Sequence, residues 1–540
     1  MTPNIDTKDL YRLPQEERRL GWILRDRAAK EGDRTFMRMG DATHSFAGTH
    51  AISTDIARGL RNLGVGSGDY VAMMLPNCTE FVLTWFAAAL RNAAIVPINP
   101  QYRGFLFDAP LRETKTRGLV IHRDLAEALP TLDSKMLAQL EWVAVVGGIE
   151  GLDLPPGVNA FEFADLQVEG TDDVEIDGTY RDIHCVMYTS GTTGPSKGVL
   201  LSNAQFFSSA SVFLRAVALT RDDVLFTPLP LFHGLASRLG VLPALIIGAE
   251  IVIGERFSGT RFWQQAAEAS ATVGHTIFSI PPVLKAQAPG PQDTAHTLRC
   301  MYNAHHDAEF ETRFNVRLVE AYGMTETGLC IFTDYPDRRE GSSGIVHEDY
   351  EVQLVDDFDN SVPVGELGEI VLRPKKPYIT MQGYLDKPAA TVEAWRNLWF
   401  HTGDIARQDA DGYFYFVDRV RDRIRRRGEN ISSWDVENFA NAHPAIAESV
   451  ALPYPAPGGE DDIRLVAVLH VGKALDAQTL ADWLEERMPR FMLPRYIEFT
   501  DSLPRNPASK VEKYKLVNRG LAADVWNREA GTTSRPARER

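Results

Sequence analysis

Cysteine is scarce in this chain, which has four cysteines among 540 residues. They stand at positions 78, 185, 300 and 330, without the close spacing of paired metal ligands. Such scattered cysteines are typical of free thiols in a reducing compartment. The longest apolar run, residues 241–253, is interrupted by Pro243, Gly248 and Glu250 and is shorter than the roughly 20 residues of a membrane-spanning helix. The N-terminus lacks a basic segment followed by an apolar one, so we expect no signal peptide and a cytoplasmic location.

An excess of positive charge is also absent. The 57 Lys and Arg residues are outnumbered by 73 Asp and Glu residues, and the net charge is -16. Nucleic acids and anionic membranes are polyanions, so this balance argues against both as general partners. An anionic substrate would therefore need a local basic patch. The apolar content of 44% is ordinary for a globular protein, and 540 residues suffice for two or more domains.

Strand-like and helix-like segments alternate along most of the chain. The apolar run 70–75 precedes a helix-like segment at 80–91, and the run 118–121 precedes another at 124–129. This rhythm predicts an α/β protein with largely parallel sheets. Residues 344–375 differ, because short strands at 351–355 and 369–372 alternate with polar turns and predict an antiparallel β module.

A change in charge density marks a domain boundary. Six arginines lie between positions 419 and 427, and a compact α/β pattern follows them. We therefore predict an N-terminal domain at 1–420 and a C-terminal domain at 421–528, joined near Arg421. The last residues, 529–540, are polar and are expected to be disordered.

The most informative segment is Tyr188-Thr-Ser-Gly-Thr-Thr-Gly-Pro-Ser-Lys-Gly-Val199, which follows an apolar strand-like run at 183–187. Glycines allow backbone N–H groups to approach phosphate oxygens, while hydroxyl groups and a lysine add donors and positive charge. The spacing differs from the common P-loop, since Lys197 is followed by Gly198. A flexible solvent loop is the alternative. The predicted phosphate-binding residues are Thr189, Ser190, Gly191, Thr192, Thr193, Gly194 and Lys197.

This segment resembles the phosphate loop of the adenylate-forming enzymes, a superfamily that includes acyl-CoA ligases, peptide-synthetase adenylation domains and luciferases. The resemblance covers roughly residues 20–528. Within the superfamily, the sequences Arg427-Gly-Glu-Asn-Ile-Ser432 and Leu521-Ala-Ala-Asp-Val-Trp526 look most like the crotonobetaine/carnitine-CoA ligase subgroup. The resemblance implies a large N-terminal domain of parallel sheets with a β module, followed by a small mobile α/β C-terminal domain.

Two further motifs match the nucleotide site of this superfamily. Tyr322-Gly-Met-Thr-Glu-Thr-Gly328 resembles the motif in which the Glu holds Mg²⁺, the Thr contacts phosphate and the aromatic residue lies near adenine. These roles would fall to Glu326, Thr325 and Tyr322, and Mg²⁺ does prefer carboxylate and phosphate oxygens. His401-Thr-Gly-Asp404 resembles the ribose-binding motif, in which Asp404 would accept hydrogen bonds from both ribose hydroxyls. Arg419 matches a residue that also reaches the nucleotide. In isolation, the 322–328 segment is also consistent with a turn that ends a strand, and a lone Thr-Gly-Asp is more often a solvated turn.

The acyl site is expected around Pro228-Leu-Pro-Leu-Phe-His-Gly234. This segment resembles the loop between the acyl pocket and the CoA tunnel, which places His233 beside the acyl carboxylate. A lone histidine among apolar residues is otherwise more often a core residue. Ala304 and Gly323 are the other predicted pocket residues. The abundance of Phe, Leu and Ala in the pocket segments indicates a largely apolar and bulky acid.

The C-terminal part carries three more matches. Leu503-Pro-Arg-Asn-Pro-Ala-Ser-Lys510 resembles the segment with the adenylation lysine, although Ser509 replaces the usual Gly. An ammonium at Lys510 would stabilise charge developing between the acid and the α-phosphate. Arg421 occupies the hinge position, usually Asp or Lys. The segment from Arg427 through Gly428 and Glu429 resembles the loop lining the pantetheine tunnel of CoA-forming members. The neighbouring arginines would meet the CoA phosphates or, alternatively, form a solvated charged face.

One motif departs from the superfamily pattern. A glycine-containing loop normally wraps the adenine before the strand that leads to Tyr322, whereas this chain reads Met301-Tyr-Asn-Ala-His-His-Asp-Ala-Glu-Phe310. Glycine allows close approach to a flat base, so its loss is expected to weaken ATP binding. A metal site at His305-His306-Asp307 is disfavoured, because adjacent histidines point in different directions.

The resemblance implies an acyl-CoA ligase that uses ATP, Mg²⁺ and coenzyme A. A carboxylic acid would be converted to its acyl adenylate and then to its CoA thioester. Three alternatives remain: an enzyme impaired in adenylation that uses an acyl-AMP from a separate adenylating enzyme, an acyl-AMP ligase that loads a carrier protein, and a non-catalytic binding paralogue. The last is disfavoured by the retention of Lys197, Glu326, Asp404 and Lys510.

Overall fold

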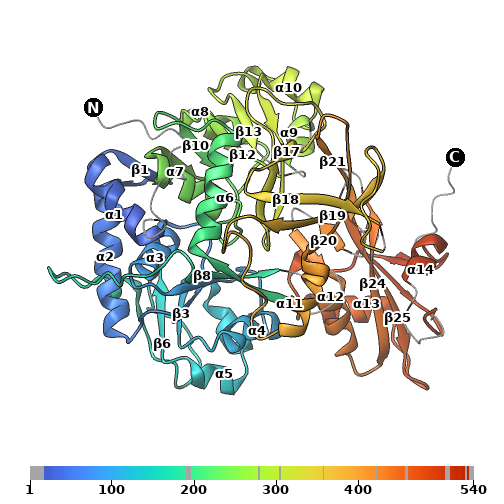
Figure 1. Ribbon diagram of the computed structural model, residues 1–540. Coiled ribbons are helices and arrows are strands. Elements are labelled where there is room, and N and C mark those ends of the chain that lie inside the picture. The colour runs from blue at the N-terminus through green and yellow to red at the C-terminus, as the bar shows by residue number, and fades with distance from the viewer. Residues whose placement is uncertain are drawn as a thin grey trace. The chain divides into compact units, whose positions relative to one another are not determined.

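The computed structural model describes most of the chain, and its described residues form two compact units (Figure 1). The described residues are 18–189, 196–277, 280–302, 306–356, 358–419, 423–426, 429–456, 460–504, 511, 513–529 and 532–533, with the backbone alone at 417–419, 423, 430, 432, 434, 514 and 532–533. The large unit comprises Met1–Pro100, Phe105–Tyr188 and Gly198–Asp418. The small unit comprises Gln101–Gly104, Thr189–Lys197 and Arg419–Arg540.

The first sheet of the large unit has seven strands in the order β7-β6-β5-β3-β4-β8-β9. Neighbouring strands from β7 to β8 are parallel. Parallel strands are covered on both faces, which explains why β6, Trp-Val-Ala-Val-Val, is apolar and buried throughout. The strands are β3 (Tyr70–Met74), β4 (Ala94–Pro97), β5 (Gly118–His122), β6 (Trp142–Val146), β7 (Ala160–Glu162), β8 (Ile183–Thr189) and β9 (Lys197–Ser202).

A second seven-stranded sheet has the order β14-β13-β12-β10-β11-β1-β2. It is parallel except at its β1–β2 edge. The strands are β1 (Thr35–Met39), β2 (Ala42–Ser45), β10 (Val224–Thr227), β11 (Glu250–Ile253), β12 (Val273–His275), β13 (Cys300–Tyr302) and β14 (Arg317–Val319).

Helix α6 (Asn203–Ala216), green in Figure 1, runs through the interior of the large unit, and nearly all of its residues are buried. It begins where the Ser202 side chain accepts a hydrogen bond from the Gln205 backbone N–H, a typical N-cap. A π-helix at Ser237–Val241 continues into α7 (Leu242–Ile247), which ends at Gly248 in the left-handed conformation. The other helices of the large unit are α1 (Leu20–Glu31), α2 (Phe46–Asn62), α3 (Thr79–Leu90), α4 (Phe105–Glu113), α5 (Ser134–Gln139), α8 (Phe262–Glu268), α9 (Ile280–Lys285), α10 (Ala308–Phe314) and α11 (Pro388–Ala394).

The predicted antiparallel β module is confirmed. Strands β18 (Tyr350–Val355) and β19 (Leu367–Pro374) pair antiparallel, and β19 pairs antiparallel with β20 (Phe400–Gln408). Strand β21 (Phe414–Arg419) completes this four-stranded sheet. A three-stranded sheet precedes it, formed by β15 (Ala321–Met324), β16 (Gly328–Phe332) and β17 (Ile345–Val346).

The small unit has a five-stranded sheet and its own apolar core. The core contains Val450, Leu452, Val466, Leu503 and Leu516. The sheet strands are β24 (Ile446–Pro455), β25 (Asp461–Leu469), β26 (Tyr496–Phe499), β27 (Trp526–Asn527) and β28 (Thr532–Thr533). A ribbon of β22 (Arg423–Arg426) and β23 (Glu429–Ser432) precedes them, and the helices are α12 (Ser433–Asn441), α13 (Ala477–Glu485) and α14 (Lys513–Arg519).

The mixed α/β class is therefore confirmed, with one local correction. The helix-like segment predicted at 124–129 is a 3₁₀ helix, Arg123–Thr131, with Pro130 inside it. Pro130 has no N–H group, so it cannot donate the hydrogen bond that would continue an α-helix. Within the described part of the chain, no helix is both long and apolar enough to cross a membrane.

Candidate active site

The predicted nucleotide motif 322–328 forms the β15–β16 hairpin. Glycine is needed at position 323, because a Cβ atom there would lie 2.2 Å from the Gly328 carbonyl oxygen. Gly328 itself has φ +70°, which favours glycine. The close approach of the two strands places Thr325 and Glu326 at the tip of the hairpin.

Two residues that the sequence assigned to the nucleoside contact each other directly. The Tyr322 hydroxyl donates a hydrogen bond of 2.8 Å to Oδ2 of Asp404, although the two residues are 82 positions apart. Tyr322 is 8% exposed and Asp404 is 1% exposed. Burial, together with the Asp404 charge, raises the pKa of Tyr322, so the phenol stays a donor at neutral pH. The ring stacks on Phe416, with centroids 6.1 Å apart.

Glu326, the predicted magnesium ligand, is buried and held by its neighbours. Its Oε1 accepts a hydrogen bond of 3.1 Å from the Tyr384 hydroxyl, and its backbone oxygen accepts one of 2.7 Å from the Met381 N–H. Gln205 of α6 donates to the Thr325 and Glu326 carbonyls at 2.9 and 3.0 Å. One carboxylate in such a turn fits Mg²⁺, which proteins bind through one or two carboxylates together with substrate phosphates. Sequence reasoning missed Tyr384 and Gln205, since neither stands in a recognisable motif.

The predicted acyl loop at 228–234 lies between β10 and the π-helix. Hydrogen bonds to Asn77, a residue far away in the sequence, hold it in place. Asn77 donates hydrogen bonds of 2.9 and 2.8 Å to the Leu229 and Gly254 carbonyls and accepts one of 2.8 Å from the Leu231 N–H. The His233 ring packs on Phe232 with centroids 4.2 Å apart. Asn77 was also missed, because an asparagine between a strand and a helix reads as an ordinary turn residue.

The predicted phosphate loop connects two strands. Thr189 ends β8 and Lys197 begins β9, while positions 190–194 lie outside the described residues. Within this connection, the Ser196 hydroxyl donates a hydrogen bond of 2.8 Å to the Thr189 carbonyl.

An ionic contact anchors the strand that leads into this loop. The Tyr188 hydroxyl donates a hydrogen bond of 2.9 Å to Glu113 of α4, and the Lys387 ammonium forms an ion pair of 2.9 Å with the same carboxylate. Burial, together with the charge of Glu113, raises the pKa of Tyr188 and keeps it a donor.

The remaining predicted residues belong to the small unit or lie outside the described residues. Arg419 ends β21 and is described by its backbone alone, whereas Glu429 begins β23 and pairs with Arg426 in the ribbon. Arg426 is 9% exposed and forms an ion pair of 3.3 Å with Asp462, so this arginine stabilises the small unit. Predicted residues outside the described part are Ala304, Arg421, Arg427, Gly428 and Lys510.

The described part of the unusual loop at 303–309 is tied to its surroundings. The His306 N–H donates a hydrogen bond of 2.8 Å to Glu320. Asp307 caps α10 by accepting a hydrogen bond of 3.0 Å from the Phe310 N–H, and it pairs with Lys285 at 3.0 Å. Among the described residues, no cluster of three or more His, Cys, Asp or Glu side chains could hold a metal ion.

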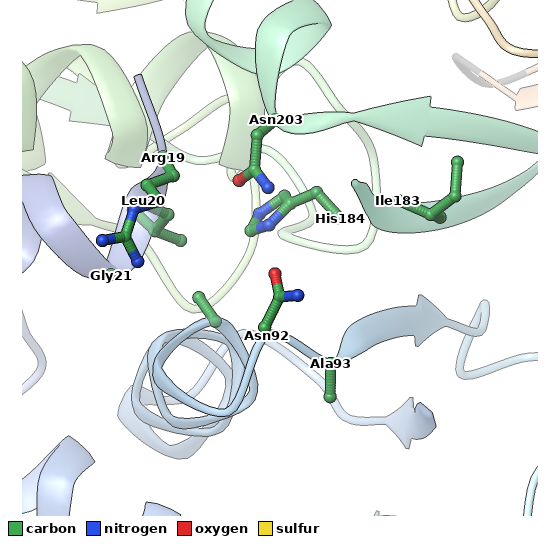
Figure 2. A pocket seen from close by; sticks show the side chains of 9 residues that line it. Arg19, Leu20, Gly21, Asn92, Ala93, Ile183, His184 and Asn203 are labelled. Atoms are coloured by element: carbon green, nitrogen blue, oxygen red, sulfur yellow. The ribbon is translucent and has the colours of Figure 1, made fainter. Parts of the chain in front are cut away.

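A small polar pocket lies in the large unit beside α1 and α6 (Figure 2). The amide groups of Asn92 and Asn203 point toward the His184 ring, whose Nε2 accepts a hydrogen bond of 2.7 Å from Trp85. Burial lowers the pKa of His184 to about 3, so the imidazole is neutral. None of the predicted site residues lines this pocket, whose walls are Arg19, Leu20, Gly21, Ala89, Asn92, Ala93, Ile183, His184 and Asn203. Its polar walls suit an ordered water molecule.

Comparison with known proteins identifies the family. The model of the AMP-binding enzyme family matches residues 24–385, and the model of the AMP-binding enzyme C-terminal domain matches residues 435–510. A crotonobetaine/carnitine-CoA ligase of Salmonella paratyphi A is 32% identical over 480 residues, covering 87% of this chain and 92% of the relative. The Salmonella typhi enzyme of the same name is 33% identical over 462 residues, with coverages of 84% and 89%.

Solved structures share the fold. The o-succinylbenzoate CoA synthetase of Bacillus subtilis, bound to a product analogue, has a TM-score of 0.78 and 24% identity over 92% of this chain and 98% of its own. An anthranilate CoA ligase in complex with anthranoyl-AMP has a TM-score of 0.70 and 22% identity, with coverages of 94% and 98%. The family model spans well over half of the chain, and the relatives exceed 30% identity over most of it. The chain therefore belongs to the AMP-binding enzyme family.

Proposed function

We propose that the protein is an acid–thiol ligase that converts a carboxylic acid to its CoA thioester through an acyl adenylate. The observation that carries the proposal is the hydrogen bond between Tyr322 and Asp404, with Glu326 at the tip of the hairpin that holds Tyr322, in the family whose members bind AMP. The names of the relatives, which are CoA ligases, support the thiol as acceptor.

The first step is adenylation. An oxygen of the acid attacks the α-phosphorus of ATP, the bond to the β-phosphate breaks, and pyrophosphate leaves. Asp404 binds the ribose, Tyr322 lies at the adenine, and Thr325 and the 189–197 loop bind phosphate oxygens. Glu326 would hold Mg²⁺, which neutralises phosphate charge. Lys510 stabilises the charge that develops at the reacting oxygens.

The second step transfers the acyl group. The CoA sulfur attacks the acyl carbon, the bond to AMP breaks, and the thiol proton passes to solvent. We assign the 421–528 domain to a rotation about Arg421 that exchanges Lys510 for the CoA-binding segment at 427–429. We assign His233 to the acyl carboxylate and Gly323 and Ala304 to binding of the acyl group. Buried aromatic side chains of α6, including Phe206 and Phe207, support a largely apolar, bulky acid. The free cysteines agree with action in the cytoplasm.

A second candidate function is favoured by the loop at 303–309. It lacks the glycine expected near adenine. In its described part, the His306 N–H bonds to Glu320, and Asp307 pairs with Lys285 and caps α10. On this reading, ATP binds weakly and the enzyme mainly transfers an acyl-AMP made by a separate adenylating enzyme to CoA.

One experiment separates these functions. Carboxylic acids are supplied with ATP, and separately as preformed adenylates, with CoA present. Pyrophosphate exchange and the thioester are then measured. The two-step ligase gives exchange and thioester from both supplies, whereas the second candidate gives thioester from the adenylate alone. Exchange without thioester, but with acylation of a carrier protein, indicates a carrier-loading ligase. No reaction from either supply contradicts the proposal and favours a binding paralogue. Asp404→Ala serves as the control, because it should remove exchange in any adenylating enzyme.

A further inference from the structure

A buried cation lies beside the predicted acyl loop at 228–234 and the nucleotide hairpin at 322–328. Arg238, in the π-helix that follows the His233 loop, is 5% exposed. Its Nη1 donates one long hydrogen bond of 3.4 Å to the Thr325 carbonyl, at the tip of the nucleotide hairpin. Its Nε atom is buried without a hydrogen-bond partner among the described residues. Over the same part of the chain, no carboxylate lies within ion-pair distance of this guanidinium.

The other buried arginines are satisfied differently. The carboxylate-paired ones are Arg27, Arg58, Arg426 and Arg464. Arg91 donates to two backbone carbonyls, of Val65 and Val174. Burial of a charge without such partners costs several kcal/mol. Among the buried arginines of the described residues, Arg238 is therefore the one that has no carboxylate partner and makes a single hydrogen bond, as is expected of a group that binds a ligand.

The surroundings of Arg238 place it at the acyl site. Its Nε lies 3.6 Å from the point where a Cβ of Gly234 would stand, and Met187 atoms lie 3.5 Å from the same point. Gly234 is the last residue of the predicted acyl loop. On another side, the guanidinium carbon is 5.9 Å from the centroid of the Phe206 ring. The cation thus contacts the His233 loop, α6 and the nucleotide hairpin together.

Helix α6 adds polar groups to the same region. Gln205 donates to the Thr325 carbonyl that also accepts from Arg238. Gln205, Ser208 and Ser209 share one face of the helix, at positions i, i+3 and i+4. Their Oε1 and Oγ atoms are buried and have no hydrogen-bond partner in the described structure. Of these groups, the Ser208 and Ser209 hydroxyls can donate to an anionic ligand, whereas the Gln205 Oε1 atom can only accept a hydrogen bond.

We infer that Arg238 is a specificity-determining residue that binds a second anionic group, a carboxylate, on the acyl part of the substrate. This inference rests on the proposed function. Arginine suits the role, because its planar fork matches a carboxylate with two parallel hydrogen bonds. In a protein with a net charge of -16, a buried cation also supplies the local compensation that a doubly charged acid needs. The substrate is then a dicarboxylic acid with an apolar body.

The test compares matched pairs of acids. Each straight-chain or aromatic dicarboxylic acid is paired with its monomethyl ester, and kcat/KM for thioester formation is measured with ATP and CoA, and with preformed adenylates. The wild type should prefer the best diacid over its ester by about 10²-fold, since an unpaired buried charge is costly. Arg238→Met should lower kcat/KM for the diacid by about 10²-fold and leave the ester within about threefold. Arg215→Met is the control, because Arg215 lies near the end of α6 and pairs with the exposed Glu348.

Binding gives a second readout that does not need turnover. The rise in melting temperature on adding each acid, with AMP present, is measured for the three proteins. A rise with diacids that Arg238→Met removes supports the inference even if no thioester forms, and the absence of thioester would then contradict the proposed function alone. An ester preference in the wild type, or an equal loss for both members of every pair in Arg238→Met, would overturn the inference. So would the absence of any diacid-specific rise in melting temperature.

Discussion

Replacing Tyr322 with phenylalanine tests whether its hydroxyl positions the Asp404 carboxylate. The substitution keeps the ring, and with it the stacking on Phe416, and removes one hydrogen bond of 2.8 Å. The acceptor is charged and 1% exposed, so water cannot readily replace the lost donor. A hydrogen bond to a buried charged group contributes about 1.5–3 kcal/mol. We therefore expect Tyr322→Phe to lower the free energy of unfolding by about 2 kcal/mol.

Calorimetric or spectroscopic thermal unfolding measures this loss as a fall of a few degrees in Tm, because large domains shift by about 2–4 °C or less per kcal/mol. AMP should stabilise the variant more than the wild type, since the ribose hydroxyls offer Asp404 new donors. A double-mutant cycle with Asp404→Asn isolates the contact and should give a coupling energy of about 1 kcal/mol or more. Tyr378→Phe is the control, because Tyr378 is 36% exposed and should change stability by less than about 0.5 kcal/mol.

Two outcomes would refute this reasoning. An additive cycle would mean that the Tyr322 hydroxyl does not stabilise Asp404. If AMP stabilised the variant and the wild type equally, Asp404 would not bind the ribose. The assignment of Tyr322 and Asp404 to the nucleoside site would then be wrong.

The remaining predictions concern catalysis, the acyl loop and pH. Lys510→Ala should slow acyl-AMP formation by a factor on the order of 10² or more while sparing thioester formation from preformed acyl-AMP. Equal losses in both assays would contradict the assignment of Lys510 as the adenylation lysine. Asn77→Ala removes two hydrogen bonds to the acyl loop, at Leu229 and Leu231, and one to Gly254. We therefore expect a loss of about 1–3 kcal/mol in thermal unfolding together with a raised KM for the acid, whereas an unchanged KM would separate Asn77 from the acyl site. His184 is neutral when folded, and its pKa of about 3 lies below the unfolded value, so stability is lost as pH falls below about 6.5. His184→Gln should reduce that loss by up to about 1.4 kcal/mol per pH unit, seen in denaturant unfolding between pH 7 and 5, and an unaltered slope would place the acid sensitivity elsewhere.

The sequence alone located five of the strands. The predictions at 70–75, 118–121, 183–187, 351–355 and 369–372 coincide with β3, β5, β8, β18 and β19. At β3, β5 and β8 the apolar run itself reports burial, because a strand of a parallel sheet is covered on both faces. Strands β18 and β19 are antiparallel and carry exposed polar residues, and the short segments between polar turns located them. The helix-like segment at 124–129 was less informative, since its pattern did not distinguish an α-helix from the 3₁₀ helix that forms there.

The motifs likewise determined the family, because phosphate and metal chemistry demands particular residue types at short spacings. Asn77, Tyr384, Gln205 and Arg238 carry no such local signal, and only the tertiary structure shows that they contact the predicted site segments. Asn77 reaches a loop 152 residues away, and Tyr384 reaches Glu326 across 58 positions. Burial depends on the folded interior. The residues next to Arg238 in the sequence therefore do not predict that it is buried without a carboxylate partner among the described residues. Local composition decided which segments form strands and phosphate loops, whereas long-range packing decided which polar groups face one another at the site.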